Sequence, residues 1–366
     1  MSDQVRTEGR PSPPGDKVVF AQVEPTTRCN FTCGFCSGRK MDQSDFAAED
    51  FARLLDSFPE LEHIELQGEG EPLLHKGFFD MARQAAARGI RLSMITNGSL
   101  FSEERVAAIL DVGVEAIYVS LESPEDEVFQ EIRGGLFSKV KDGIARLLAA
   151  RRARGLERPT VGFAITVLND TIDSLPQVAD LYRALGMDGG ATIQPLNRME
   201  SYTDVYDAEM AARLLGPEDR RRLQETIHRH PEIGAMLAEV RQTRHFYIEM
   251  RRRYPAEHGC PWVKGALYVD RHGAIASCCM VKDTARYGLG KIGLTPMDLV
   301  MEKRREIDAA LEAGRPPEQC RGCAYYISPQ RRDARRINRL AAQKAQARRP
   351  APSLPSSPGS GGQGPA

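Results

Sequence analysis

The stretch "CNFTCGFC", Cys29–Cys36, places three cysteines within a short segment of a 366-residue chain that has eight cysteines in all. Three thiolates leave one metal position open, as chemistry at a metal requires, whereas four would saturate a zinc ion or a four-iron cluster. The loop follows a β-rich run that begins at Lys17, and parallel α/β folds build their sites where strands end. We therefore interpret Cys29, Cys33 and Cys36 as ligands; the alternative is three structural thiols in a loop.

The composition limits the cellular setting and the partners. Lys plus Arg equals Asp plus Glu at 50 each, so the chain as a whole has no bias towards nucleic acid or an anionic membrane. The N-terminus lacks the apolar core of a signal peptide, and no run of eighteen apolar residues occurs. We expect a cytoplasmic protein, and in a reducing cytosol clustered cysteines are more often metal ligands or catalysts than disulfides.

Short β-rich runs alternate with amphipathic stretches along the first half of the chain. The runs begin at Lys17, His63, Arg91, Ala116, Thr160 and Gly190. The segments between them carry apolar residues at helical spacing and mostly end on glycine. Six β/α units in a row predict an α/β fold with a parallel sheet, either doubly wound or curled into a partial barrel.

The rest of the chain divides by composition. Residues 1–16 and the end of segment 327–366 are polar and rich in Pro, Gly or Ser, which predicts disorder, and a basic helix is expected at Arg331–Arg349. Residues 201–258 read as charged helices, either a lid inserted over the barrel or a linker. A hairpin, one amphipathic helix and five cysteines predict a small domain at 259–326.

These motifs together resemble the radical S-adenosylmethionine (radical SAM) enzymes, whose signature is C-x3-C-x2-C. The resemblance implies a partial (β/α)6 barrel over residues 17–200. It also implies a 4Fe-4S cluster on the three cysteines, with its fourth iron chelated by SAM. The stretch "GEGEPLL", Gly68–Leu74, is similar to the family's glycine-glycine-glutamate-proline motif. Its residues Gly70, Glu71 and Pro72 would hold the amino group of SAM, whereas Glu69 departs from the glycine common in the family.

Further polar residues fall where the family contacts SAM. They lie at or after the third, fourth and sixth predicted strands, and are Thr96, Asn97, Ser120, Glu122, Arg133 and Gln194. The resemblance implies that they meet the ribose and methionine parts of the cofactor. Each could equally be an ordinary polar group at a strand end, or, for Arg133, on a helix surface.

The second group of cysteines resembles the SPASM/Twitch auxiliary-cluster domain of the family. Four of its cysteines would bind one auxiliary 4Fe-4S cluster, namely Cys260, Cys278, Cys320 and Cys323. The alternative for the same four thiolates is a structural zinc ribbon. Cys279 remains over: it could be a small buried hydrophobe, replace Cys278 as a ligand, or be a catalytic hydrogen-atom donor.

The resemblance implies an enzyme that cleaves SAM reductively and abstracts hydrogen from an unactivated C–H bond. A single auxiliary cluster most resembles the radical SAM dehydrogenases of cyclitols and amino sugars, so we expect oxidation of a hydroxyl-bearing carbon in natural-product biosynthesis. The alternatives are a radical epimerase, a maturase that cross-links or epimerises a ribosomal peptide, and a non-enzymatic metal-binding protein. The expected partners are a small-molecule or peptide substrate and a one-electron donor such as flavodoxin or ferredoxin.

Overall fold

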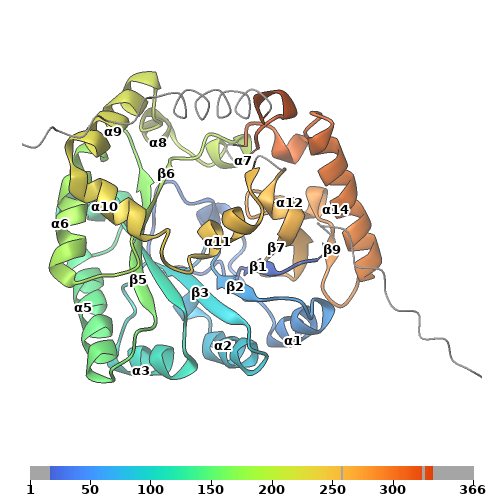
Figure 1. Ribbon diagram of the computed structural model, residues 1–366, viewed down its shortest axis with the longest axis horizontal. Helices are drawn as coiled ribbons and strands as arrows, with labels where there is room; N and C mark the ends of the chain where they lie inside the picture. The colour runs from blue at the N-terminus through green and yellow to red at the C-terminus, as the bar shows by residue number, and fades with distance from the viewer. Residues whose placement is uncertain (1–16, 257–258, 324–325, 333–366) are drawn as a thin grey trace, which may run out of the picture.

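The computed structural model describes residues 17–256, 259–323 and 326–332 (Figure 1). The predicted N-terminal tail, residues 1–16, and the basic segment from residue 333 onwards lie outside these residues. No helix within the described ranges is both long and apolar enough to cross a membrane.

Six parallel strands lie side by side in chain order and form the barrel wall. They are β1 (Phe20–Val23), β2 (His63–Leu66), β3 (Arg91–Thr96), β4 (Ala116–Ser120), β5 (Thr160–Val167) and β6 (Ala191–Pro195). The register pairs Val23 with Leu66, and Leu66 with Met94, so the carboxyl ends of neighbouring strands meet at one edge. The α/β fold with six parallel units that the sequence predicts is confirmed.

Helices follow the strands and cover the outer side of the curved sheet (Figure 1). They are α1 (Ala48–Ser57), α2 (Phe78–Ala87), α3 (Glu103–Val112), α4 (Asp126–Arg133), α5 (Phe137–Ala153) and α6 (Leu175–Leu185), with the short 3-10 helices η1 (Ser37–Lys40), η2 (Pro72–Leu74) and η3 (Ile172–Ser174). Helix α3 shows how the sequence determines where a helix begins and ends. The Ser102 hydroxyl accepts the backbone N–H of Arg105 at its start, and Gly113 ends it with φ of 71°, a conformation that favours glycine.

The described residues of the predicted segment 201–258 form α-helices, the first of which begins one residue earlier. They are α7 (Glu200–Thr203), α8 (Ala208–Ala212), α9 (Pro217–Arg229), α10 (Pro231–Glu239) and α11 (Phe246–Arg253). Figure 1 places α11 inside the curve of the sheet. There, Phe246 packs edge-on against Phe20, with ring centroids 5.5 Å apart, and Glu249 accepts two hydrogen bonds from Arg91 at 2.6 and 2.8 Å. Because Arg91 begins β3, α11 closes the amino-terminal end of the barrel interior.

The C-terminal segment extends the barrel sheet. Strand β7 (Ala266–Val269) pairs in parallel with β1, and β8 (Ala274–Ala276) and β9 (Gly290–Lys291) follow in antiparallel order, which gives one nine-stranded sheet. The segment also contains α12 (Pro261–Gly265), α13 (Thr284–Tyr287), α14 (Met297–Glu312) and η5 (Glu318–Cys320). The four predicted auxiliary cysteines therefore lie in a segment whose strands continue the barrel wall.

Candidate active site

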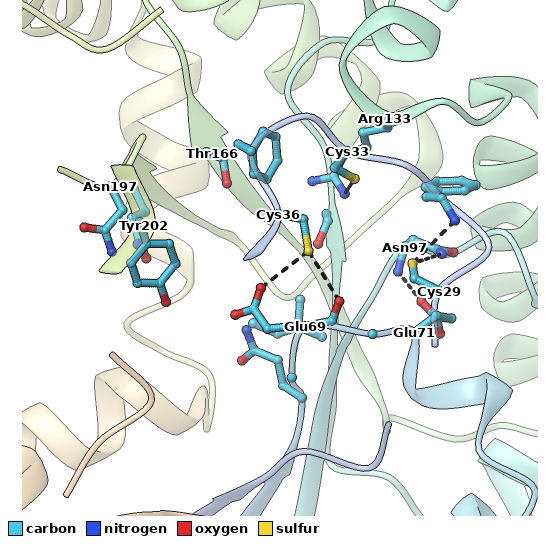
Figure 2. Close-up of a pocket in the computed structure, with 18 of the residues that line it drawn as sticks. Cys29, Cys33, Cys36, Glu69, Glu71, Asn97, Arg133, Thr166, Asn197 and Tyr202 are labelled. Carbon is cyan, nitrogen blue, oxygen red and sulfur yellow. Dashed lines mark hydrogen bonds between the residues drawn. The ribbon is translucent and has the colours of Figure 1, made fainter. Parts of the chain in front are cut away.

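The loop that carries Cys29, Cys33 and Cys36 is anchored at its start and in its middle. At its start, the Thr27 hydroxyl donates to the carbonyl oxygen of Asp42 at 2.7 Å. Further on, the N–H of Thr32 donates to the carbonyl oxygen of Arg133 at the end of α4, at 2.9 Å. The three thiols consequently line one cavity of about 240 Å³ at the carboxyl ends of the strands (Figure 2).

The Gly68–Leu74 motif follows β2 and lies directly against the start of this loop. The N–H of Glu71 donates to the carbonyl oxygen of Arg28 at 2.8 Å. A Cβ atom on Gly70 would lie 2.6 Å from the same oxygen, a distance that side chains do not tolerate. Glycine at this position is therefore required by the close approach of the two backbones.

Glu71 is fixed as a buried acceptor in the cavity wall. Its carboxylate accepts the Thr96 hydroxyl and the N–H of Asn97, both at 2.7 Å, and the N–H of Leu73 at 3.1 Å. Burial raises the pKa of Glu71, and these hydrogen bonds oppose that rise. Thr96 and Asn97 line the same cavity, so the structure brings the predicted motif after β2 and the predicted residues after β3 together.

Of the other predicted SAM contacts, some line the three-cysteine cavity and some are buried away from it. Ser120 and Gln194 line the cavity, whereas Pro72 is buried at the start of η2. Glu122 is fully buried and accepts two hydrogen bonds from Arg133, both at 2.5 Å, so its carboxylate faces that guanidinium. Arg133 lines the cavity, with Nη1 3.7 Å from Cys33 Sγ.

Glu69, noted in the sequence only as a departure from a motif, has a specific partner. Its Oε2 lies 3.4 Å from Cys36 Sγ, and its carboxylate pairs with the Lys282 ammonium from the C-terminal segment. The two side chains are only 13% and 10% exposed. Burial raises the pKa of Glu69, but Lys282 outweighs this and holds it below the usual value. Lys282 also lies over the ring of Tyr202, at 5.3 Å.

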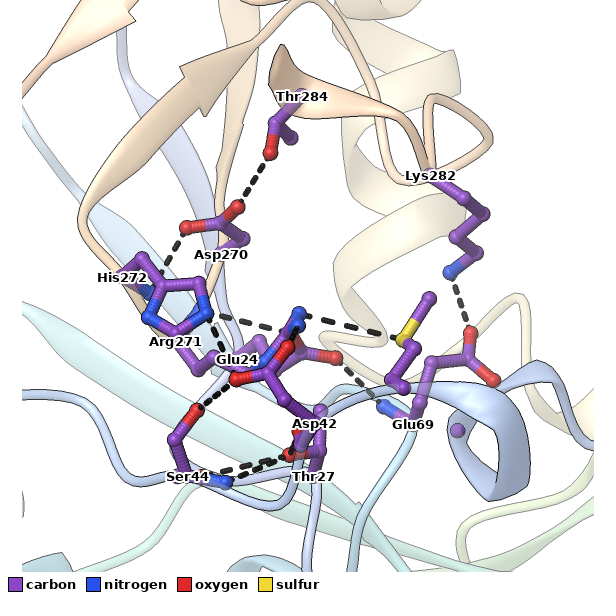
Figure 3. A network of polar contacts seen from close by, with 12 residues as sticks. Glu24, Thr27, Asp42, Ser44, Glu69, Asp270, Arg271, His272, Lys282 and Thr284 are labelled. Carbon is purple, nitrogen blue, oxygen red and sulfur yellow. Dashed lines mark hydrogen bonds and ion pairs between the residues drawn. The ribbon is translucent and has the colours of Figure 1, made fainter.

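A second ion-paired group ties the three-cysteine loop to the β7–β8 hairpin (Figure 3). Buried Glu24 accepts the N–H of Glu69 at 2.8 Å and lies 3.4 Å from Arg271 in the hairpin. Arg271 in turn pairs with Asp42 in the loop that follows the cysteines. Sequence reasoning did not find Arg271 or Lys282, because no local pattern links a cation to a carboxylate more than 200 residues away.

The four predicted auxiliary cysteines surround one small cavity. Cys260, Cys278, Cys320 and Cys323 line it together with Trp262 and other side chains. Burial raises the pKa of the Cys320 thiol to about 12 and that of Cys278 well above its usual value. Among the described residues, no group of three or more His, Cys, Asp or Glu side chains has the arrangement of a single-ion site.

Cys279 lines a different cavity from its neighbour Cys278. This central cavity, of about 220 Å³, also contains Glu69, Lys282 and Tyr247. The Tyr247 hydroxyl lies 2.7 Å from Gln22 Oε1 and 2.8 Å from Gln67 Oε1. Gln67, Glu69, Ser120, Thr166, Gln194 and Tyr202 line both the central and the three-cysteine cavity. The two cavities are therefore continuous.

Comparison with known proteins identifies the fold around these cavities. Residues 23–182 match the Radical SAM superfamily. This chain carries a radical SAM domain. A Pyrococcus furiosus tungsten-containing aldehyde ferredoxin oxidoreductase cofactor-modifying protein is 29% identical over 201 residues, 53% of this chain and 56% of that protein. A GTP 3',8-cyclase of Sinorhizobium medicae is 31% identical over 188 residues, 48% of this chain and 52% of that protein. The chain thus spans slightly more than half of the length of these curated relatives.

Solved structures share the same architecture. Streptococcus suis SuiB bound to S-adenosylmethionine superposes with a TM-score of 0.60 at 14% identity, over 85% of this chain and 72% of that one. The anSMEcpe structure with bound AdoMet gives 0.59 at 17% identity, over 84% and 87%. At these identities the likeness shows the fold alone.

The residues of the radical SAM domain fit the cofactors that the superfamily uses. Burial raises the pKa of Cys33 to about 11 and that of Cys36 well above its usual value. Thiolates at these positions therefore need positive charge beside them, which bound iron would supply. The cavity beside the three thiols offers Glu71 as an acceptor for an ammonium group and Asn97 and Ser120 as neutral polar groups. This donor set suits SAM on a three-cysteine 4Fe-4S cluster.

Proposed function

We propose that this radical SAM enzyme oxidises a hydroxyl-bearing carbon of a sugar, cyclitol or related natural-product intermediate. One observation supports this most directly. The three-cysteine cavity opens into a polar central cavity that ends beside the four-cysteine site, so a bound substrate would lie between the two cysteine groups. Gln22, Gln67 and Tyr247 offer hydroxyl-binding amide and phenol groups there.

The roles of the chain's own residues follow from their positions. Cys29, Cys33 and Cys36 would hold the first cluster, with Glu71 fixing the amino group of SAM. When bound, SAM and this cluster supply a radical that abstracts a hydrogen atom, and an external one-electron donor such as flavodoxin or ferredoxin supplies the electron. Helix α11, which lines the central cavity, would shield its amino-terminal side from water.

The oxidation balances if, as the CH–OH group becomes C=O, the substrate gives one hydrogen atom to the radical, one proton to the solvent and one electron to an acceptor. A second 4Fe-4S cluster on Cys260, Cys278, Cys320 and Cys323 would accept that electron. The proximity of this site to the central cavity, where Met280 and Trp262 line both, supports the assignment.

Epimerisation is the second candidate, and the position of Cys279 favours it. Its thiol lines the central cavity, so it could return a hydrogen atom to the substrate radical. The solved structures include SuiB with its precursor peptide SuiA and anSMEcpe with a peptide. A peptide therefore remains the alternative substrate class.

Product mass and isotope content distinguish these functions. Candidate substrates are incubated anaerobically with SAM, a strong reductant and either the parent or Cys279→Ala. Oxidation predicts a product lighter by about two mass units from both proteins, since two hydrogens leave and no donor thiol is used. A product whose mass is unchanged in ordinary water, that gains one deuterium in heavy water and that is lost with Cys279→Ala, would replace oxidation by epimerisation.

A further inference from the structure

A further cavity opens from the active site between β6 and the C-terminal segment. It measures about 300 Å³, and three arginines line it: Arg198 after β6, Arg220 on α9 and Arg251 on α11. Among the residues that the structure describes, no acidic side chain lines it; the remaining lining is neutral and mostly apolar. We call it the arginine cavity.

The arginine cavity is continuous with the proposed reaction site. Gln194 lines the three-cysteine, the central and the arginine cavity, and Asn197 lines both the arginine and the three-cysteine cavity. Arg251 and Met280 line both the arginine and the central cavity. A molecule whose reacting carbon lies in the central cavity can therefore extend a substituent to the arginines.

The other two cavities are lined by charged side chains of both signs. Arg133 pairs with Glu122, and Lys282 pairs with Glu69. In the arginine cavity, by contrast, the charged residues of the described lining are all arginines. Arg198 is held in place by donating to the carbonyl oxygen of Leu215. A planar guanidinium group can donate two parallel hydrogen bonds to two oxygens of a phosphate or a carboxylate.

We propose that the arginine cavity binds an oxyanion substituent, a phosphate or a carboxylate, of the substrate. This rests on the proposed function, in that the bound molecule is the substrate of the radical reaction. Anchoring a remote charged group would position the reacting carbon and use binding energy away from the bond that breaks. The substrate class narrows accordingly to an anionic hydroxyl-bearing molecule.

Anion binding can be measured without the substrate. Inorganic phosphate and acetate are titrated separately into the iron-loaded protein by isothermal calorimetry at low ionic strength. Arg220→Gln/Arg251→Gln should weaken binding at least about tenfold, because two charge-assisted contacts are lost. Arg229→Gln/Arg252→Gln is the matched control: it removes the same charge from the same two helices outside the cavity lining, and should bind as the parent does. Preference for phosphate or acetate identifies the substituent.

Three results would overturn the proposal: no binding of either anion by the parent, the same loss in the control, or no loss in the cavity variant. A drop in iron content with Arg220→Gln/Arg251→Gln would also overturn it, since the arginines would then serve the site around Cys323, which borders the cavity. SAM cleavage without substrate is measured in parallel. If the parent binds phosphate but never cleaves SAM, the proposed function fails while the anion site stands.

Discussion

Replacing Lys282 by methionine should destabilise the protein far more than its position in a loop suggests. The change keeps the aliphatic stem but removes the ammonium that pairs with Glu69. Both side chains are about nine-tenths shielded from water, so the pair belongs with buried rather than surface ion pairs. Removing one partner of a buried pair costs about 3–5 kcal/mol, whereas an exposed pair contributes about 1 kcal/mol or less. Because the pair borders a cavity, we expect the lower value, about 3 kcal/mol.

The penalty arises from the carboxylate left behind beside Cys36. Glu69→Gln/Lys282→Met removes both charges and should recover most of the lost stability. Lys291→Met, on exposed β9 of the same segment, is the control and should change stability by less than about 0.5 kcal/mol.

Urea unfolding of the iron-free proteins under reducing conditions tests this directly. Trp262, the only tryptophan, is buried in the segment that Lys282 ties to the barrel, so its fluorescence reports on the affected region. A loss below about 1 kcal/mol in Lys282→Met, or a double variant no more stable than the single one, would refute the reasoning.

Three further predictions concern the cofactors and pH. The parent protein, reconstituted anaerobically, should bind about eight irons. Changing Cys29, Cys33 and Cys36 together to alanine should remove about half of this iron. Zinc in place of iron would contradict the two-cluster assignment. Glu71→Ala should weaken SAM binding about tenfold or more in equilibrium dialysis with iron content intact, and unchanged binding would mean that Glu71 is misassigned. Burial lowers the pKa of His245 to about 3, whereas an unfolded histidine titrates near 6.5. Between pH 7.5 and 5.5 only the unfolded chain gains this proton, so the free energy of unfolding should fall by about 1.4 kcal/mol. His245→Asn should abolish this part of the pH dependence of stability, measured by urea unfolding. An unchanged pH dependence in the variant would exclude His245 as the cause.

The barrel was predictable because its signals are local. Each of the six strands begins at the first residue of a predicted β-rich run or within three residues of it. The runs can be recognised because strands buried on both faces are continuous apolar stretches. The motif residues Gly70 and Glu71 could also be located from the sequence, because they are adjacent in one short loop after β2. What the sequence could not show was β7 pairing with β1, which depends on a contact between residues 246 positions apart. The continuous sheet and the ion pairs of Lys282 and Arg271 follow from that pairing.

The adjacent cysteines Cys278 and Cys279 are another case that the sequence alone could not resolve. The sequence left open whether Cys278 or Cys279 is the auxiliary ligand, because adjacent residues have identical spacing arguments. In the fold they follow β8 and line different cavities. Cys278 lines the cavity of the other three auxiliary cysteines, and Cys279 lines the central cavity beside Lys282 and Glu69. This division favours Cys278 as the ligand. It also places the surplus thiol where a hydrogen-atom donor would be needed, so the role of Cys279 depends on the chemistry of the substrate and no longer on the choice of the fourth predicted ligand.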